Sequence, residues 1–258
     1  MRLLILGGTT EASALARRIA GRRDLDPVLS FAGRTRNPTP PAIPFRVGGF
    51  GGITGLKTYL TEHRTDAVID ATHPFAVQMS RHAAAACHDL GVPLAAFTRP
   101  AWTSQDGDRW IGVPDLAAAA TALGKQPRTV FLTIGGVQVA AFAAAPQHHY
   151  IVRAIDRPDA IRWLPSHRLI LARGPFSVAD EIILLRDKKV DVLITKNSGG
   201  AATEAKLLAA RTTGTEVIIV ERPPPEDTVA FEVLDDVLAW IEAHRSAPLR
   251  PAPLRSAP

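Results

Sequence analysis

The sequence lacks several features that define whole classes of protein. Only one of its 258 residues is a cysteine, Cys87, which excludes a disulfide framework and a thiolate-bound structural zinc or iron–sulfur cluster. No apolar run approaches the ~20 residues that a membrane-spanning helix needs. The H-E-x-x-H, G-x-S-x-G and P-loop signatures are missing, which gives no support to a metalloprotease, a serine hydrolase or a Walker-type NTPase. We therefore expect a cytoplasmic protein with no metal site and no membrane partner.

The charge is only mildly positive, at +5 for the whole chain. Two of these charges, Arg250 and Arg255, lie in segment 246–258, which contains no acid and leaves +3 for the rest. No Lys/Arg cluster interleaved with aromatic residues occurs, so we expect no nucleic-acid partner. A small anionic ligand accounts for the positive bias equally well.

Short apolar runs alternate with longer helical stretches along most of the chain. The predicted strands are 2–6, 27–31, 67–70, 93–97, 129–134, 150–154, 168–172, 191–195 and 216–220. The predicted helices are 11–21, 52–64, 76–90, 114–123, 178–188, 203–211 and 234–244. Strands that are apolar throughout are typical of a parallel sheet buried on both faces. The pattern predicts an α/β protein with two Rossmann-like, doubly wound parallel-sheet domains and a cleft between them.

Segment 98–108 separates the two predicted domains, because it is rich in Pro, Gly, Ser and Asp and has no apolar period. We place the first domain at 1–98 and the second at 99–245. The last helix fits packing on either domain. Segment 246–258 repeats Ala-Pro-Leu-Arg twice and is predicted to be a disordered, Pro-rich tail.

A glycine-rich turn joins the first strand to the first helix. Gly7 and Gly8 allow the backbone to turn tightly and approach a phosphate, and the helix start offers N–H donors. Thr9 or Thr10 can cap the helix or donate a hydroxyl to the phosphate. The third glycine of the G-x-G-x-x-G fingerprint is absent, so a plain turn with a threonine cap also fits.

The end of the second strand carries no carboxylate between Ser30 and Thr35, where an NAD-binding domain usually holds the ribose diol. Arg34 occupies the position where the 2′-phosphate of NADP(H) would lie. If a dinucleotide binds, this pattern favours NADP(H), whereas a solvated loop arginine is the alternative.

Polar residues also follow two later strands. Asp70, Thr72 and His73 come after one buried strand, where Asp70 could orient His73 as a ligand contact or proton carrier. A simple helix cap with exposed Thr72 and His73 fits as well. The run from Thr195 to Gly200 follows another strand, and its Lys196 and N–H donors suit a carboxylate or phosphate.

Together these motifs resemble those of the precorrin-6A reductases of cobalamin biosynthesis, also called precorrin-6x reductases. The motifs are Gly7-Gly8-Thr9-Thr10-Glu11-Ala12, Ala32-Gly33-Arg34-Thr35, Asp70-Ala71-Thr72-His73-Pro74-Phe75-Ala76, and Thr195-Lys196-Asn197-Ser198-Gly199-Gly200 with Thr203 and Lys206. The resemblance implies NADPH-dependent reduction of one ring double bond, which converts precorrin-6A to precorrin-6B. It also implies a tetrapyrrole polycarboxylate as substrate, and it leaves room for brief contacts with neighbouring pathway enzymes.

The resemblance assigns roles to the residues of these motifs. Cofactor contacts are expected from Gly7, Gly8, Thr9, Thr10, Ser30, Arg34, Thr35, Thr72, His73 and Phe75. Contacts to the substrate are expected from Lys196, Asn197, Ser198, Gly199 and Thr203. His73 and Lys196 are candidate proton donors, but we expect water or the acidic arms of the substrate to serve, with no obligatory catalytic side chain.

Two other functions fit the motifs. A cobalt-precorrin-6A reductase of the anaerobic route would share all of them, and only the arginine preference for NADPH leans toward the metal-free ring. A non-catalytic dinucleotide-sensing protein would explain the glycine turn, but it would not explain a second set of polar strand ends.

Replacing Arg34 tests the cofactor preference. Arg34→Ala is expected to raise the dissociation constant for NADPH roughly ten- to hundredfold, because a charge-assisted pair with a phosphate is lost. The constant for NADH should hardly change. Arg34→Lys should restore only part of the affinity, since an ammonium lacks the planar fork. Cofactor titrations at fixed ionic strength measure both constants, and equal weakening of the two cofactors would make Arg34 structural.

Overall fold

The structure is a computed structural model that describes residues 1–33 and 40–245. Arg34, Thr35 and the predicted tail 246–258 lie outside the described residues. The described chain forms two compact units. The first unit comprises 1–33, 40–98 and 226–245, and the second comprises 99–225.

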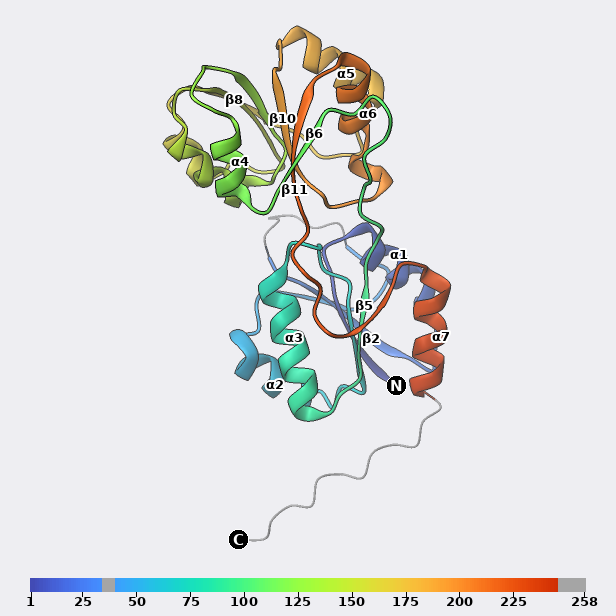
Figure 1. Ribbon diagram of the computed structural model, residues 1–258. Coiled ribbons are helices and arrows are strands. Elements are labelled where there is room, and N and C mark those ends of the chain that lie inside the picture. The colour runs from blue at the N-terminus through green and yellow to red at the C-terminus, as the bar shows by residue number, and fades with distance from the viewer. Residues whose placement is uncertain (34–39, 246–258) are drawn as a thin grey trace. The chain divides into compact units, whose positions relative to one another are not determined.

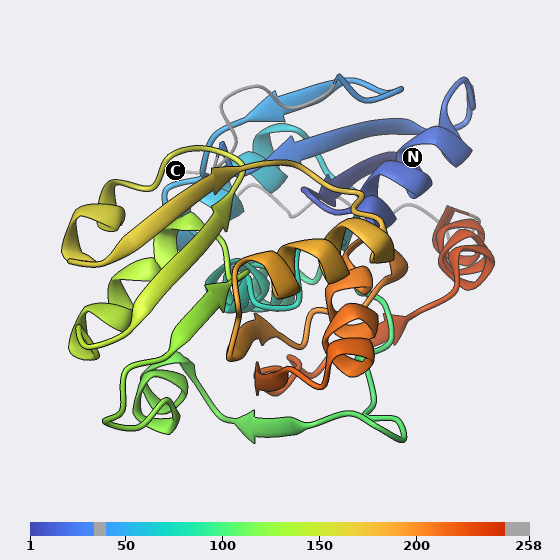
Figure 2. The same ribbon diagram turned by 90° about the horizontal axis from the view of Figure 1, so that it is seen from above.

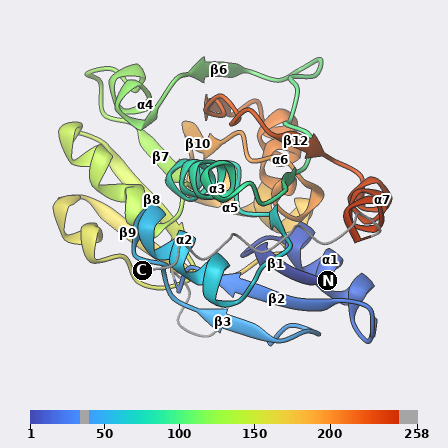
Figure 3. The ribbon, with the colours of Figure 1, turned by 90° about the horizontal axis from the view of Figure 1, so that it is seen from below.

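The first unit is a six-stranded parallel sheet with helices on both faces (Figure 1). Its strands are β1 (Arg2–Leu6), β2 (Asp26–Phe31), β3 (Phe45–Val47), β4 (Ala67–Asp70), β5 (Leu94–Phe97) and β12 (Val229–Phe231). Its helices are α1 (Thr10–Ile19), α2 (Gly52–Glu62), α3 (Val77–Leu90) and α7 (Leu234–Arg245). The strand order is β3-β2-β1-β4-β5-β12, and Figure 3 shows β1, β2 and β3 side by side. This order is that of dinucleotide-binding Rossmann sheets.

The second unit repeats this plan. Its strands are β6 (Trp110–Val113), β7 (Thr129–Leu132), β8 (His149–Ala154), β9 (His167–Leu171), β10 (Val192–Lys196) and β11 (Glu216–Val220). Its helices are α4 (Leu116–Ala122), α5 (Val178–Asp187), α6 (Ala205–Thr213) and the 3-10 segments η1 (Gly136–Ala144), η2 (Asp159–Trp163) and η3 (Ala201–Thr203). The order is β9-β8-β7-β10-β11-β6, all parallel, and Figure 2 shows β8 beside β9.

Each sheet has an apolar core on both faces, as its continuous apolar strands require. In the first unit, α1 and α7 cover one face through residues such as Leu15 and Ile241, and α2 and α3 cover the other through residues such as Leu56. In the second unit, α5 and α6 pack on one face of the sheet. Across residues 1–33 and 40–245, none of the helices combines the length and apolarity needed to cross a bilayer.

The predicted fold class of two doubly wound parallel sheets is confirmed. All nine predicted strands are present, with ends that shift by up to two residues. Three further strands, β3, β6 and β12, were not predicted. Each of these strands has three or four residues and at least one exposed large apolar side chain, such as Val47, Ile111 or Val229. Edge strands of this kind lack the continuous apolar run that identified the others.

The sixth strand of each sheet is not the strand that follows the fifth one in the sequence. β6 follows β5 of the first unit in the sequence but pairs with β11 of the second. Conversely, β12 follows β11 but pairs with β5. The second domain was predicted to continue to residue 245, whereas 226–245 supply β12 and α7 to the first unit. The last helix therefore packs on the first unit, which is one of the two alternatives that the sequence left open.

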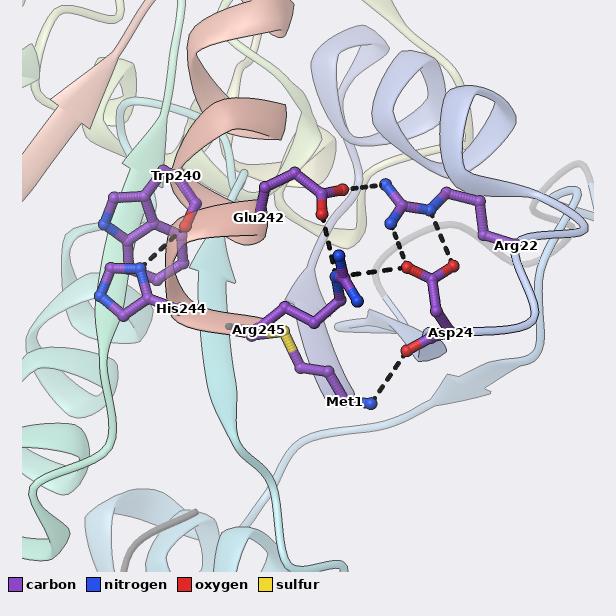
Figure 4. Close-up of polar contacts among 7 residues, drawn as sticks. All are labelled: Met1, Arg22, Asp24, Trp240, Glu242, His244 and Arg245. Atoms are coloured by element: carbon purple, nitrogen blue, oxygen red, sulfur yellow. Dashed lines mark hydrogen bonds and ion pairs between the residues drawn. The ribbon is translucent and has the colours of Figure 1, made fainter. Parts of the chain in front are cut away.

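Two kinds of contact hold α7 on the first unit. Val237 and Ile241 are fully buried in the core that α1 shares with the sheet. At the surface, Arg22 forms ion pairs with Asp24 and with Glu242 of α7, and Arg245 reaches the same two carboxylates (Figure 4). These pairs raise the pKa of Arg22 and lower the pKa of Asp24 to about 2. Because exposed ion pairs contribute little, the apolar contacts dominate.

Substitutions in α7 separate these contributions. Ile241→Ala is expected to lower the free energy of unfolding of the first unit by about 2–5 kcal/mol, since it leaves a cavity in a packed core. Glu242→Ala should change it far less. Denaturant titration of both variants measures the difference, and equal losses would show that the ion pairs carry the attachment of α7.

Candidate functional site

The glycine turn lies between β1 and α1 at the carboxyl edge of the first sheet. Gly8 has a φ of +116°, which favours glycine. A Cβ on Gly7 would lie only 2.6 Å from Leu29 Cδ1 and 3.2 Å from Ala12 Cβ. The two glycines therefore serve different needs, one a left-handed backbone and the other a close approach of the chain to β2 and α1.

Three hydrogen bonds fix this turn to its neighbours. Gly7 N donates to Ser30 O at 2.9 Å, which joins the turn to β2. Thr9 Oγ1 accepts from Ala12 N at 3.1 Å and donates to Ala71 O at 2.7 Å. Thr9 is thus the helix cap, as the sequence allowed. Because its one hydroxyl proton goes to Ala71, Thr9 holds the turn beside the loop after β4, and backbone N–H groups remain as the donors for an anion.

The loop after β4 brings the next predicted residues to the same edge. Asp70 Oδ1 accepts from Thr72 N at 3.0 Å and from Thr72 Oγ1 at 2.6 Å. Asp70 was expected to orient His73, and these two bonds instead orient Thr72. His73 Nδ1 accepts from Phe75 N at 3.2 Å. A ring nitrogen that accepts a hydrogen bond carries no proton, so this geometry assigns the proton of neutral His73 to Nε2.

Ser30 is buried, with 5% of its surface exposed. Its Oγ accepts from Arg46 Nη1 at 2.7 Å. Arg46 was missed in the sequence because it lies in β3, one of the unpredicted strands. Arg46 would have been found by a search for Lys and Arg residues in the segment after the second predicted strand, where a neighbouring strand could form. Hydrogen bonds therefore link Gly7 to Ser30 and Ser30 to Arg46. Arg34 and Thr35 lie outside the described part of the chain.

The second group of predicted residues follows β10 in the second unit. Lys196 Nζ donates to Gln138 Oε1 of η1 at 2.9 Å. The amide of Asn197 is paired with the backbone of Trp102, whose N donates to Oδ1 at 2.9 Å and whose O accepts from Nδ2 at 3.1 Å. Asn197 is 6% exposed, so its side chain fixes the loop to segment 98–108.

Two arginines brace the loop from 197 to 200. Ser198 O accepts from Arg99 Nε at 2.8 Å and from Arg222 Nη2 at 2.9 Å. Gly199 O accepts from Arg99 Nε at 3.0 Å, and Arg222 Nε donates to Asn197 O at 2.8 Å. The two guanidinium groups and Lys196 place three cations at this edge of the second sheet, against the carboxylate of Glu221, which lies 3.4 Å from Asn197 Nδ2. Arg222 follows β11, so applying the strand-end rule to that strand would have found it.

The backbone of this loop requires its glycines. Gly199 and Gly200 have φ values of +68° and +83°. A Cβ on Gly199 would lie 2.0 Å from Pro100 O, and one on Gly200 would lie 2.7 Å from Arg99 Cδ. A side chain at either position would push the loop away from the arginines that hold it.

Three buried ionisable side chains, Arg153, Glu181 and Lys206, lie near this loop. Arg153 of β8 forms a two-bond pair with Glu181 of α5, and both side chains are buried. Lys206 of α6 is 4% exposed and donates to Thr203 O at 2.6 Å. Its Nζ lies 4.8 Å from the centre of the Trp102 ring. Burial, and then the nearby Arg153, lower the pKa of Lys206 to about 7, which Glu181 opposes. Lys206 thus ties the first turn of α6 to the end of the loop.

Other parts of the described chain offer weaker candidates. A solvent-open hollow is lined by Arg2, Asp26, Tyr59 and His63, but it lies at the amino edge of the first sheet, opposite the edge where parallel sheets bind ligands. Within residues 1–33 and 40–245, no three His, Cys, Asp or Glu side chains gather as a metal site would require. Cys87 is buried, and burial raises its pKa to about 12, so it is an unreactive core residue.

Comparison with known proteins gives a consistent result. The model of the family "Precorrin-6x reductase CbiJ/CobK" matches residues 2–242. Precorrin-6A reductase of Rhodobacter capsulatus is 50% identical over 249 residues, which cover 96% of this chain and 98% of that one. The enzyme of the same name from Rhodococcus erythropolis is 48% identical over 243 residues, which cover 93% of this chain and 97% of that one. A solved structure, CobK precorrin-6A reductase, superposes with a TM-score of 0.89 at 49% identity over 95% of this chain and 97% of that chain.

The buried amine of Lys206 makes stability depend on pH. Its pKa is about 7 in the fold against 10.5 ordinarily, so between these values the unfolded chain binds a proton that the folded chain does not. The free energy of unfolding should therefore rise with pH from about 7 to about 10, by up to about 1.4 kcal/mol per pH unit.

Comparison with Lys206→Met isolates this effect. In this variant the free energy of unfolding should lack the rise with pH that Lys206 causes. In Lys125→Met, at an exposed position of the same unit, the rise should remain. Denaturant titrations across the pH range give the three curves. Parallel curves for the wild type and Lys206→Met would contradict an uncharged, buried Lys206.

Proposed function

Because the chain belongs to the precorrin-6x reductase family, we propose that it reduces precorrin-6A with NADPH as the hydride source, bound at the carboxyl edge of its first sheet. The chain is an oxidoreductase of cobalamin biosynthesis, and a reductase of this family requires a nicotinamide cofactor. This membership sets aside the non-catalytic dinucleotide-sensing alternative. The choice of NADPH over NADH and the residue roles are the substance of the proposal.

The observation that carries the cofactor site is the glycine turn within the Rossmann strand order. A Cβ at Gly7 would clash with Leu29, so the backbone of the turn runs closer to β2 than any other residue would allow. The following helix, α1, has ten residues and begins at this edge. Its first N–H groups would hold the cofactor phosphates, with Thr10 exposed beside them. The residues present therefore fit a dinucleotide.

The loop after β4 would receive the nicotinamide end. β4 lies beside β1 in the sheet, and the Thr9 bond to Ala71 O fixes the spacing between the two loops. Thr72, held by Asp70, and the His73–Phe75 pair then line the edge next to the glycine turn. When bound, the cofactor supplies a hydride to a ring carbon of the macrocycle. The protein contributes by positioning, since the conjugated ring is itself the electrophile.

The positive loop after β10 would bind carboxylate arms of the substrate. Lys196 supplies a cation, while Arg99 and Arg222 hold the loop carbonyls and add to the positive potential. Asn197, engaged with Trp102, acts by fixing this loop. We assign the proton that accompanies the hydride to water or to a substrate carboxylic acid. His73 and Lys196 remain candidates, and neither is obligatory.

A spectral assay tests the whole proposal. The folded protein is mixed with precorrin-6A and NADPH, and the absorbances of the corrin precursor and of the reduced nicotinamide are followed together. The concentrations of precorrin-6A and NADPH, calculated from these absorbances, should fall by equal molar amounts. Parallel reactions with NADH and with cobalt-precorrin-6A test the choice of cofactor and ring. Unchanged spectra with folded protein and NADPH would refute the proposed reaction.

Lys196→Met tests the carboxylate role within that assay. Loss of one charge-assisted contact should raise the KM for precorrin-6A roughly tenfold or more. The melting temperature and the KM for NADPH should stay close to those of the wild type, because the half-buried Lys196 bonds to the side chain of Gln138 and is not part of the apolar core. Lys125→Met is the matched control. Wild-type kinetics for Lys196→Met would remove this loop from substrate binding.

A further inference from the structure

Arg46, the central residue of β3, is held in one orientation. It pairs with Ser30 in the register of β2 and β3. Its Nη1 donates to Ser30 Oγ at 2.7 Å and to Gly48 O at 2.9 Å, and its Nη2 donates to Gly49 O at 3.1 Å. The guanidinium carbon also lies 4.0 Å from the centre of the Phe50 ring and 5.4 Å from that of Tyr59. An arginine restrained in this way is preorganised for a ligand.

The charge of Arg46 has no counter-ion in the described part of the chain. None of the ion pairs among residues 1–33 and 40–245 involves it. The segment from 34 to 39 contains no acidic residue that could supply one. Arg46 is half-buried, and three of its five N–H groups are used by the bonds above. The remaining Nε and Nη2 donors are suited to a fork on an anion.

The position of Arg46 relative to the glycine turn indicates which anion it binds. Gly7 donates to the backbone of Ser30, and the side chain of Ser30 accepts from Arg46. Ser30 lies about 20 residues beyond the turn, the separation at which dinucleotide-binding sheets read the ribose 2′ position. Ser30 itself is buried and bonded to Arg46, so the group presented at this position is a guanidinium.

We propose that Arg46 is a specificity-determining residue whose guanidinium binds the 2′-phosphate of NADPH and thereby discriminates against NADH. The inference rests on the proposed function, since it assumes a nicotinamide dinucleotide on the glycine turn. It adds a second cation to the one predicted at Arg34. It also gives Ser30 a defined task, which is to hold the guanidinium in place.

Equilibrium binding tests the proposal without catalysis. Isothermal titration calorimetry is carried out with NADPH, NADH, 2′,5′-ADP and 5′-AMP on the wild type, Arg46→Gln, Arg46→Lys and the control Arg17→Gln. Arg17 is an exposed arginine of α1 in the same unit. Arg46→Gln should weaken NADPH and 2′,5′-ADP roughly ten- to hundredfold, with NADH and 5′-AMP nearly unchanged. Arg46→Lys should show a smaller loss, and Arg17→Gln should match the wild type.

The four ligands separate the ways in which the proposal can fail. Unchanged NADPH affinity in Arg46→Gln, or equal weakening of NADPH and NADH, overturns the role of Arg46 and leaves the proposed function standing. Weakening of NADH and 5′-AMP alone would place the guanidinium on another part of the cofactor and also overturns it. A wild-type protein that binds neither NADPH nor NADH overturns the proposed function and this inference together. Retained NADH binding shows that each variant is folded.

Discussion

Parallel pairing of every strand is the constraint on which the rest of this structure depends. It forces each sheet to be covered on both faces, because the connections between parallel strands run as helices across those faces. It also collects all carboxyl strand ends of a sheet on one edge. The polar residues near the ends of β2, β3 and β4 and just beyond β1 and β4 come from distant parts of the sequence, and this pairing brings them to one edge.

The two units use this edge in chemically different ways. In the first unit, two glycines and the hydroxyls of Thr9 and Thr72 shape an edge of backbone donors with one restrained cation, Arg46. In the second unit, Arg99 and Arg222 bind backbone carbonyls, so the positive charge itself holds the loop in shape. The first arrangement suits phosphates that approach a backbone closely, and the second suits carboxylates attracted by charge.

The fold was largely predictable from the sequence because buried parallel strands have a strong local signature. The glycine turn and the Thr9 cap followed from local rules as well. No comparable signal marks β3, β6 or β12, which are short edge strands with exposed apolar side chains. Arg46, Arg99 and Arg222 were missed as well. Arg46 lies in one of these unpredicted strands, and Arg222 follows a predicted strand whose end was not searched. The role of Arg99 comes from its contact with Ser198, which is distant in the sequence and leaves no local pattern.

The return of the chain to the first unit after the second one determines which unit is completed last during synthesis. Every strand of the second sheet, β6 included, lies within one continuous stretch, residues 99–225. The first sheet still lacks its edge strand β12 and its covering helix α7 when residue 225 has been made. The amino-terminal unit is therefore the last to be complete. Until residues 226–245 emerge from the ribosome, the side of its core around Leu15 and Ile19 that Val237 and Ile241 later cover stays exposed, together with the open edge of β5.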